Sequence, residues 1–405
     1  MRVLLVSQYF TPEVTAASAR IHAFAAGLAA RGHEVEVVCE VPSHPAGVIE
    51  PEYRRRAVAR ERLGGFRVNR VWVRATPRKS ARARIANYAS FAAMATIAGA
   101  TLARADVVLA SSPPLPVGSV GAALAIRHRA PWVLDVRDLW PEVAVLMGEL
   151  GEGRALRAAE RLERRLYRSA AAIVTVTEPF RRQISERGGD GKVELIANGA
   201  APEFLEAGGE EPDREAAGLS ADRFVWSYAG NLGKAQGLEA AIEAAGMLGN
   251  GFELVLTGAG PMREELRARA SRLPPGSVSF REAAPAAEVA GMLRAADALL
   301  VPLAAWTGLS GFVPSKLFDC CAVGRPVIAA TPGEANRLAE EAGAALAIAP
   351  GDPLALADAV RRLRDEPELA DSLSAAGRAF GEANARERGV DRLESLLERV
   401  AAEGR

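Results

Sequence analysis

Histidine and cysteine are scarce in this sequence. The chain has no HExxH, no DxD, and no Cys/His spacing suited to zinc. Its four histidines are His22, His33, His44 and His128. None of them stands beside a serine or cysteine in a nucleophile-elbow context. Hydrolytic triads and metal-bridged phosphate chemistry therefore have no support in the sequence.

The three cysteines make a poor disulfide framework. Cys320 and Cys321 are adjacent in the sequence, and Cys39 is remote from both. This usage is typical of a protein in a reducing cytoplasm. A cytoplasmic location is therefore expected.

Long hydrophobic runs are missing as well. The nearest to a membrane-spanning length is the Ala-rich stretch from Asn87 to Ala103, which has 17 residues. We expect a buried helix there, with a surface that meets lipid as the alternative. The apolar run in MRVLLVSQYF is too short for a signal peptide and fits a first β-strand better.

A net charge of one sign is also lacking, but the two halves differ. Residues 1–200 hold 29 Lys and Arg against 19 Asp and Glu, and residues 201–405 hold 21 against 31. The basic excess is concentrated in residues 54–84, where twelve basic side chains accompany one acid, Glu61. This asymmetry suggests a division of labour between domains.

Short runs rich in Val, Ile and Leu alternate with helical segments throughout the 405 residues. Continuous apolar strands with helical crossovers predict parallel sheets covered on both faces. The pattern starts twice, with a Pro/Gly/Glu-rich break at residues 198–218. We therefore predict an α/β protein of two Rossmann-like, doubly wound domains facing each other across a cleft. The predicted parts are an N-terminal domain (1–200), a C-terminal domain (201–385) and a final helix (386–405).

Ligands of such sheets bind where strands end and helices begin. The first such turn is SQYFTPE, in which Pro12 and Glu13 precede small residues that include Thr15 and Ala16. Small side chains at a helix N-terminus let a ligand approach the backbone. Close helix–sheet packing is an equally good interpretation.

The second turn is DVRDLWPE, with Asp135, Arg137, Asp138 and Glu142 at the end of an apolar strand. Charged groups at the mouth of a sheet suit hydroxyl binding or proton handling. The alternative is an internal Arg–carboxylate pair that holds the loop. Four ionisable groups in eight residues favour a function.

Two further turns have the character of phosphate sites. In YAGNLGKAQ, Gly230 and Gly233 permit a tight turn before Lys234, near a helix start. In VPSKLFD, Ser315 is expected to cap a helix, which places Lys316 in its first turn. A cation at the positive end of a helix is tolerable if both share an anion, such as a diphosphate.

The motifs together resemble a known family. The order SQYFTPE, SSPPLP, DVRDLWPE, NGA, AGNLGKAQGLEAAIEAA, TGAGP and VPSKLFDCCAVGRPVIA is similar to that of the retaining GT-B glycosyltransferases of family 4. The nearest branch is that of bacterial O-antigen, capsule and exopolysaccharide synthesis, including fucosamine-type transferases. The resemblance implies metal-independent transfer from a nucleotide sugar, with retention. No cofactor is expected, because the nucleotide sugar, a UDP-sugar of N-acetylated hexosamine type, is a co-substrate.

The resemblance also assigns roles to the donor-binding residues. It implies that residues 1–200 are the acceptor-binding domain, that residues 201–385 are the nucleotide-sugar-binding domain, and that the helix 386–405 returns toward the first domain. The diphosphate is expected across Gly230–Lys234 and Lys316, and the base against backbone around Thr257–Pro261, which includes Gly258. Asp319 matches the second glutamate of the family's paired-glutamate motif, which is associated with ribose. Gly311 stands where the first glutamate occurs, so that sugar contact is expected to be missing or replaced by Ser310 or Ser315. Many relatives carry Arg and Lys in the first turn, where this chain has Asn231 and Gln236. The expected phosphate contacts therefore move onto Lys234 and Lys316.

Near the reacting sugar, Arg137 replaces a histidine of many relatives, and Asp138 or Glu142 is the candidate base. The acceptor is expected to be a polyprenyl-diphosphate-linked sugar or an oligosaccharide. The basic stretch 54–84 favours peripheral attachment to the anionic inner face of the plasma membrane, over a solvated face or nucleic-acid binding. Two rival functions remain: a GT-B-shaped sugar-nucleotide epimerase, and a non-catalytic sugar-nucleotide-binding protein.

Overall fold

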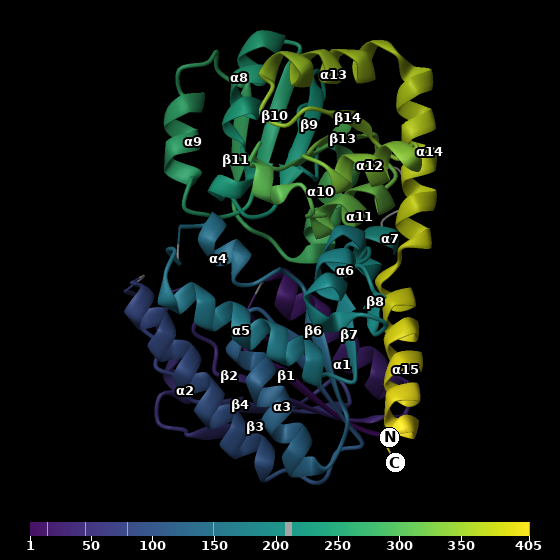
Figure 1. Cartoon of the computed structure of the whole chain (residues 1–405). Helices are drawn as coiled ribbons and strands as arrows, with labels where there is room; N and C mark the ends of the chain where they lie inside the picture. Colours follow the sequence, from purple (N-terminus) through teal and green to yellow (C-terminus); the bar gives the residue numbers. More distant parts are fainter. Residues whose placement is uncertain (14, 45, 79, 149, 207–212, 405) are drawn as a thin grey trace. The chain divides into compact units, whose positions relative to one another are not determined.

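The computed structural model of the chain describes residues 1–13, 15–44, 46–78, 80–148, 150–206 and 213–404 (Figure 1). The chain divides into two compact units. The N-terminal unit contains residues 1–197 and 387–405, and the C-terminal unit contains residues 198–386. Each unit is built on its own sheet, and we describe each by itself.

The N-terminal unit has an eight-stranded sheet in the order β3-β4-β2-β1-β5-β6-β7-β8. Its strands are β1 (Arg2–Ser7), β2 (Glu34–Glu40), β3 (Val58–Leu63), β4 (Phe66–Val71), β5 (Val107–Ser112), β6 (Trp132–Val136), β7 (Ala172–Thr175) and β8 (Val193–Leu195). Strands alternate their side chains between two faces. Val3 and Leu5 point into a core shared with helices α1 (Ala16–Ala30) and α15 (Arg386–Glu403), and Leu4 and Val6 on the opposite face are buried as well. Both faces of the sheet are therefore covered, as predicted.

One strand was missed by the sequence pattern. β3 pairs with β4 in an antiparallel hairpin, with Leu63 opposite Phe66. Gly64 and Gly65 form the turn with φ values of 52° and 93°, which a glycine pair adopts without strain. The predicted parallel sheet thus carries one antiparallel strand, at this edge. Charged side chains along β3 hid the strand, because it is an edge strand and mostly solvent-exposed.

The remaining helices of this unit are α2 (Ala81–Ala100), α3 (Pro116–His128), α4 (Glu142–Leu146), α5 (Arg154–Ser169) and α6 (Glu178–Ile184), with short turns η1 (Pro51–Tyr53) and η2 (Ser185–Gly189). The predicted Ala-rich helix is α2, which buries Phe91, Ala95 and Ala98. Within the described part of the chain, no helix is long and apolar enough to cross a membrane.

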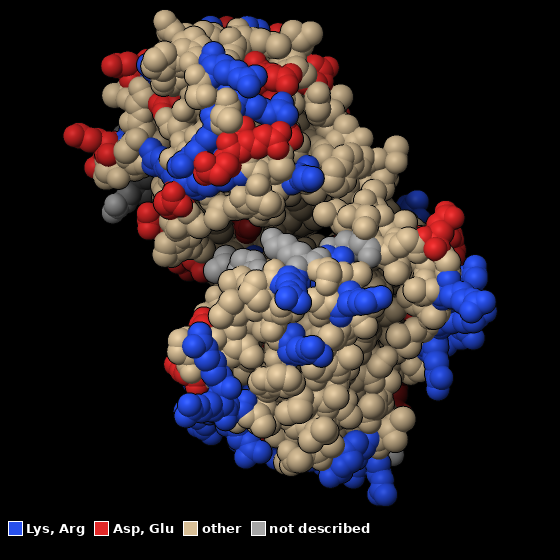
Figure 2. All heavy atoms as spheres, turned by 90° about the vertical axis from the view of Figure 1, so that its left-hand side faces the viewer, with Lys and Arg blue, Asp and Glu red and all other residues tan. Residues whose placement is uncertain are grey.

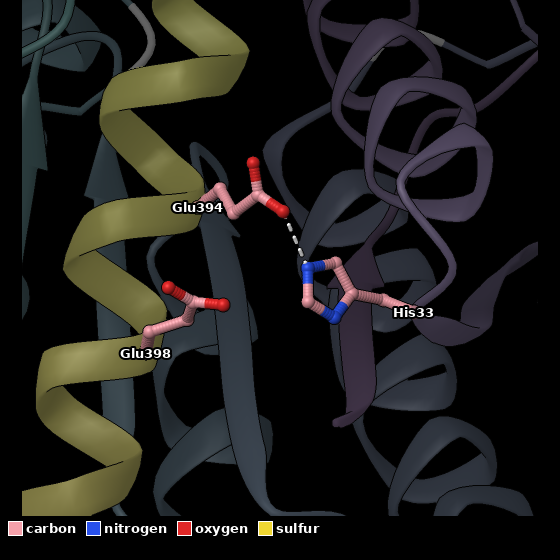
Figure 3. A group of neighbouring side chains, drawn as sticks. All are labelled: His33, Glu394 and Glu398. Carbon is pink, nitrogen blue, oxygen red and sulfur yellow. Dashed lines mark hydrogen bonds and ion pairs between the residues drawn. The ribbon is translucent and has the colours of Figure 1, made fainter.

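Helix α15 belongs to the N-terminal unit from residue 387 onward. Val390, Leu393 and Leu397 complete the core beside α1 and β1. His33 Nε2 lies 2.7 Å from Glu394, and Glu398 lies nearby on the same helix (Figure 3). These three side chains are the only group in the described ranges with metal-ligating atoms within 4.8 Å of one another.

Ion pairing already accounts for His33 and Glu394. Arg31 Nε also contacts Glu394, at 3.2 Å, and the chain's amino group lies 3.3 Å from His33 Nδ1. We therefore interpret these contacts as a polar clamp on α15.

The C-terminal unit has a six-stranded, fully parallel sheet in the order β11-β10-β9-β12-β13-β14. Its strands are β9 (Phe224–Ala229), β10 (Phe252–Thr257), β11 (Val278–Arg281), β12 (Ala298–Pro302), β13 (Val327–Ala330) and β14 (Leu346–Ile348). Its helices are α7 (Pro202–Glu206), α8 (Glu239–Leu248), α9 (Arg263–Ala270), α10 (Ala286–Ala295), α11 (Ser315–Ala322), α12 (Glu334–Glu341), α13 (Pro353–Asp365) and α14 (Pro367–Ala383), with turns η3 (Lys234–Gln236) and η4 (Thr307–Leu309).

The strand order reverses between β9 and β12, and in the other sheet between β1 and β5. Such a switch point is where ligands of doubly wound sheets bind. The turns after these strands are therefore where a site is expected in each unit.

Candidate functional site

The site of the C-terminal unit is built on two glycine turns. Gly230 follows β9 with φ of 144°, and Gly258 follows β10 with φ of 141°. A Cβ atom at Gly258 would lie 1.9 Å from the carbonyl oxygen of Gly230, so only glycine permits this approach. Leu232 N–H donates to the carbonyl of Ala259 at 2.9 Å and joins the two turns. The predicted backbone surface at Gly230 and Gly258 is therefore rigid and bare of side chains.

Lys316 lies against the first of these turns. Its Nζ donates to the Tyr228 hydroxyl at 2.7 Å and to Gln236 Oε1 at 2.9 Å, and lies 4.1 Å from the centroid of the Tyr228 ring. A Cβ at Gly230 would be 3.1 Å from Nζ. Burial lowers the pKa of this ammonium to about 8, with Cys320 and Asp319 acting in the opposite direction. The chain thus holds a desolvated cation at the sheet's switch point.

The start of α11 differs from the prediction. Ser315 is the first helical residue, and the cap position is Pro314, which has φ of −64°, ψ of 135° and no side-chain hydrogen bond. Proline fixes the extended entry to the helix, so it takes the place that serine was expected to fill. Because proline offers no side-chain acceptor, the N–H groups of the first turn lack a side-chain cap. Lys316 is in that first turn, as predicted.

The other residues of the YAGNLGKAQ turn fall into two groups. Gln236 faces Lys316, whereas Lys234 and Asn231 are exposed. Lys234 lies in η3, and its ammonium makes no hydrogen bond to any residue that the structure describes, whereas its carbonyl accepts the N–H of Gly237. The carbonyl of Asn231 accepts from the Tyr228 hydroxyl at 2.7 Å. The structure therefore brings Lys316 together with Gly230 and Gln236, and leaves Lys234 beside them as an exposed cation.

Asp319 lies one turn further along α11 and points toward the start of α7. Its Oδ1 accepts the N–H of Ala201 at 2.9 Å and lies 3.9 Å from Arg386 Nη2. Burial raises the pKa of this carboxyl to about 6, and Arg386 and the Ala201 hydrogen bond oppose that shift. Its predicted contact with ribose stays a prediction.

In the N-terminal unit, the predicted charged cluster after β6 is divided among separate partners. Asp135 is fully buried and pairs with Arg20 at 3.0 Å and with the Ser111 hydroxyl at 2.7 Å. Arg137 donates to the Ser111 hydroxyl at 3.0 Å and to the Pro113 carbonyl at 2.8 Å. The internal Arg–carboxylate pair that the sequence left open thus exists for Asp135, but its arginine comes from α1.

Asp138 and Glu142 also differ from each other in burial and in their partners. Asp138 is half-buried, and burial raises the pKa of its carboxyl while Arg137 opposes that shift. It makes no hydrogen bond to a residue of the described ranges. Glu142 opens α4 and forms an ion pair with Arg187. Of the two predicted bases, only Asp138 is held beside Arg137.

The SQYFTPE turn is tied to the end of β2. Glu13 Oε1 accepts the N–H groups of Ser43 and His44 at 2.9 and 2.8 Å. Beside it, Glu40 is buried, and burial together with Glu13 raises the pKa of its carboxyl to about 8. Thr15 caps α1 by accepting the N–H of Ser18 at 3.0 Å, and Ala16 is the first residue of that helix. These contacts favour a stabilised loop, and Pro12 and Glu13 are part of it.

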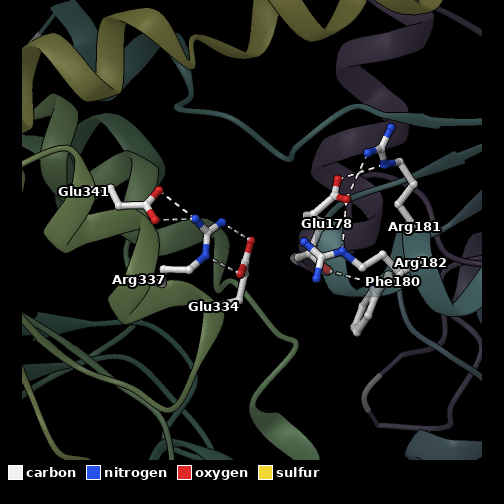
Figure 4. A network of polar contacts seen from close by, with 8 residues as sticks. Glu178, Phe180, Arg181, Arg182, Glu334, Arg337 and Glu341 are labelled. Carbon is white, nitrogen blue, oxygen red and sulfur yellow. Dashed lines mark hydrogen bonds and ion pairs between the residues drawn. The ribbon is translucent and has the colours of Figure 1, made fainter.

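Two other ion-pair networks lie outside these turns (Figure 4). On α12, Arg337 pairs with Glu334 and Glu341. On α6, Glu178 pairs with Arg181 and Arg182. The hydrogen bond from Arg181 holds the pKa of Glu178 below its ordinary value, and Glu334 and Glu341 hold the pKa of Arg337 above its own. Pairs at this spacing stabilise their own helices.

Sequence reasoning missed Tyr228 and Arg386. Tyr228 is the penultimate residue of β9 and lies inside the core, with its hydroxyl at the carboxyl edge of the sheet, where it meets Lys316. An aromatic residue two positions before a glycine turn is the available signal. Arg386 is 67 positions from Asp319 in the sequence, and no local pattern connects the two.

Comparison with known proteins gives two domain matches. Residues 15–199 match the model of a glycosyl transferase 4-like domain, and residues 223–366 match that of glycosyl transferases group 1. Glycosyltransferase WbjE of Pseudomonas aeruginosa is 28% identical over 65% of this chain and 66% of its own length. The lipopolysaccharide core biosynthesis glycosyltransferase LpsD of Rhizobium meliloti is 29% identical over 52% of this chain and 58% of its own. The chain therefore spans less than two thirds of each of these relatives.

Solved structures share the fold. HepE of Anabaena, crystallised in complex with UDP and glucose, covers 98% of this chain with a TM-score of 0.71 and 15% identity, over 100% of its own length. At that identity the likeness concerns the arrangement of the backbone.

Proposed function

We propose that the chain transfers a sugar from a nucleotide diphosphate donor to a lipid-linked or saccharide acceptor. It carries the two domains of the GT-B glycosyltransferases, and each domain matches one of the two family models. The proposed donor is a UDP-sugar of N-acetylated hexosamine type, and the proposed process is cell-surface polysaccharide synthesis. The relative WbjE supports the transferase activity, the relative LpsD supports the process, and the neighbour with bound UDP supports the base.

The observation that carries the proposal is the half-buried Lys316 at the switch point of the C-terminal sheet, whose ammonium is desolvated. Among the residues that the structure describes, no carboxylate lies within ion-pair distance of this desolvated ammonium, so it gains by meeting an anion. Gly230 and Gly258 keep the adjacent backbone free of side chains, so a diphosphate can approach both the backbone and Nζ. Gln236 and Tyr228 hold Nζ in position before the anion arrives.

The chemistry follows from where charge develops. As the sugar leaves, negative charge builds on the diphosphate oxygen, and Lys316 with the uncapped N–H groups of α11 would stabilise it. Removing one such preorganised donor costs about 100- to 1000-fold in rate. Because lysine and backbone N–H groups supply this charge, we propose that transfer is metal-independent. Transfer should therefore persist after chelator treatment, and its loss would contradict this part.

On the N-terminal unit, Asp138 is the proposed base, with Arg137 beside it. A carboxyl with a raised pKa binds a proton more readily than an exposed aspartate does. We propose that the acceptor attacks from the face that the diphosphate leaves, which gives retention. Asp138→Asn should lower transfer by about 100-fold or more while donor binding is kept. NMR of the product's anomeric configuration tests retention.

Attachment to an anionic membrane is the second part of the proposal. On α2, Ile85, Ala89, Ala93 and Ile97 follow one another at four-residue spacing and are all exposed, Ile85 by 65% and Ile97 by 62%. Exposed arginines of the preceding stretch include Arg54, Arg55, Arg56, Arg60, Arg62, Arg74, Arg78 and Arg82. Figure 2 shows Lys and Arg spread over this side of the N-terminal unit with few acids among them.

The single acid of the basic stretch does not offset that charge. Glu61 pairs with the buried Arg70, at 2.8 Å, so the outer arginines stay uncompensated by it. Each basic side chain near an anionic surface contributes about 1 kcal/mol of attraction. An apolar helix face beside exposed arginines is the pattern of an interfacial helix.

Vesicle flotation tests the membrane part. Vesicles with anionic lipid should bind the chain at low salt, and the double variant Ile85→Ser with Ile97→Ser should bind less. Ile126→Ser is the matched control, because Ile126 is 81% exposed on α3. Failure of the unmodified chain to bind anionic vesicles at any salt concentration would end this part of the proposal.

A nucleotide-sugar screen tests the enzymatic part. UDP-sugars should raise the melting temperature, and donor consumption should require an acceptor. Conversion of a UDP-sugar without any acceptor would indicate an epimerase instead. Binding without consumption across lipid-linked and saccharide acceptors would indicate a non-catalytic protein.

A further inference from the structure

The chain leaves the C-terminal unit at two places that are joined to each other. The boundaries between units lie after residue 197 and after residue 386. Ala200 N–H donates to the Asn384 carbonyl at 2.9 Å, and Arg386 N–H donates back to the Ala200 carbonyl at 2.8 Å. We call residues 198–201 and 384–386 the crossover segments. They form a small parallel bridge within the C-terminal unit.

The crossover segments are packed too closely to slide past each other. Gly199 has φ of 68°, and a Cβ atom there would lie 2.7 Å from the Asn384 carbonyl oxygen and 2.9 Å from the Cα of Arg386. Only glycine permits that contact. The two segments therefore have one arrangement in this unit.

Asp319 contacts both crossover segments. It accepts the N–H of Ala201, in the first segment, and its Oδ1 faces Arg386 of the second segment at 3.9 Å. Both side chains of the pair are mostly buried, with exposed fractions of 16% for Asp319 and 17% for Arg386. A pair with this little solvent is screened less than a surface pair.

The helix that carries Asp319 is itself fixed. Phe318 stacks on Phe380 of α14 with ring centroids 5.6 Å apart, and α14 leads directly into the second crossover segment. A Cβ atom on Gly381 would lie 2.5 Å from the Cα of Ala322, so α11 and α14 pack backbone to backbone. Lys316 and Asp319 are thus presented by one rigid element, with the proposed phosphate contact at one position and the crossover contact three residues later.

We propose that Asp319 is a positioning residue that fixes both crossover segments to the helix carrying the donor-binding Lys316. This inference rests on the proposed donor site. Its consequence is that anion binding at Lys316 stabilises the crossover segments, through α11 and the Asp319 carboxylate. The resemblance assigns the carboxylate at position 319 to ribose. In this chain that carboxylate instead contacts the two crossover segments, at Ala201 and Arg386.

Hydrogen exchange tests the contact without any nucleotide. In Asp319→Ala, the Ala201 amide loses its acceptor, so peptides covering residues 198–206 and 380–390 should exchange about tenfold faster or more. Asp319→Asn keeps an acceptor oxygen for Ala201 but loses the charge that faces Arg386, so it should show a smaller increase. Asp352→Ala is the matched control. Its carboxylate accepts backbone N–H groups at the start of α13, away from the crossover segments.

UDP is the probe for coupling. UDP should slow exchange at the glycine turns and at the crossover segments of the unmodified chain, but only at the glycine turns of Asp319→Ala. The affinity ratio between UDP and 2′-deoxy-UDP should be the same in both chains. A ribose contact would instead make that ratio collapse by about tenfold in the variant, because a hydrogen bond to a charged group would be lost.

The outcomes separate this inference from the proposed function. Unchanged exchange at the crossover segments in Asp319→Ala, or collapse of the UDP to 2′-deoxy-UDP ratio, overturns the positioning role. A lack of UDP binding by the unmodified chain contradicts the proposed donor and with it the coupling step. In that case faster exchange in the variant would still establish the structural tie alone.

Discussion

Replacing Lys316 by methionine should weaken nucleotide binding without weakening the fold. The ammonium is buried, and its pKa of about 8 lies below the ordinary lysine value of 10.5. At about 1.4 kcal/mol per unit, this difference corresponds to a cost on the order of 3 kcal/mol for keeping the charge in the unliganded site. Methionine has a similar length and carries no such cost. Tyr228 keeps a partner in the variant, because its hydroxyl also donates to the Asn231 carbonyl.

In Lys316→Met, the stability of the unliganded chain and its affinity for UDP should not fall together. The melting temperature of unliganded Lys316→Met should be equal to or higher than that of the unmodified chain. Its affinity for UDP should fall by about 10- to 150-fold, the equivalent of one charge-assisted hydrogen bond of about 1.5–3 kcal/mol. Scanning fluorimetry and titration calorimetry measure the two quantities. Lys234→Met is the control, since Lys234 is exposed and its loss should not change stability.

The pH dependence of stability is a second test of the charge cost at Lys316. Because the folded-state pKa of Lys316 is lower than the unfolded value, the unfolded chain binds more protons between about pH 8 and pH 10.5. The stability of the unmodified chain should therefore rise with pH in that window, relative to Lys316→Met. The advantage of the variant should be constant below pH 8 and vanish near pH 10.5. A variant that melts lower and binds UDP as tightly as before would refute the reasoning, because Lys316 would then be a structural residue.

Three further substitutions should separate structural charges from functional ones. Arg20→Met leaves the Asp135 carboxylate buried without its ion-pair partner, so urea unfolding should show a loss of about 3–5 kcal/mol. Glu142→Gln removes an exposed ion pair, so stability should change by less than about 1 kcal/mol and donor consumption should be unchanged. Gln236→Lys should weaken UDP binding by placing a second ammonium beside Lys316, and the double variant Gln236→Lys with Lys316→Gln should recover part of that loss, as measured by calorimetry.

The fold could be predicted largely because apolar strands and helical segments alternate at regular intervals. All strands except β3 fall on predicted runs rich in Val, Ile and Leu, and β11 ends one residue beyond its run, at Arg281. Burial on both faces of a parallel sheet makes a strand continuously apolar, and that signal is visible in a single sequence. β3 is an exposed edge strand that carries charged residues, so its pattern is weak. The turn Gly64–Gly65 is the signal that identifies it.

The charged cluster after β6 shows why proximity in sequence is a poor guide to a site. Strand residues alternate between faces, and the chain then turns into a helix, so neighbouring charges point in different directions. Asp135 points into the core and meets Arg20 from α1, 115 positions away. Glu142 meets Arg187 instead, 45 positions away. The partner of each charge is decided by packing between elements, which the local sequence does not contain.

The donor turn shows how a residue that departs from the family pattern can still be interpreted physically. By the family resemblance, Gln236 stands where many relatives carry a cation. In the structure, Gln236 Oε1 lies 2.9 Å from Lys316 Nζ. Two ammonium groups about 4 Å apart would repel each other by about 4 kcal/mol at the dielectric of a protein surface. A neutral acceptor at position 236 removes this repulsion and also orients the one cation that remains. A glutamine at position 236 is therefore compatible with a lysine at position 316, whereas lysines at both positions would repel each other. The residues at these two positions have to be interpreted together.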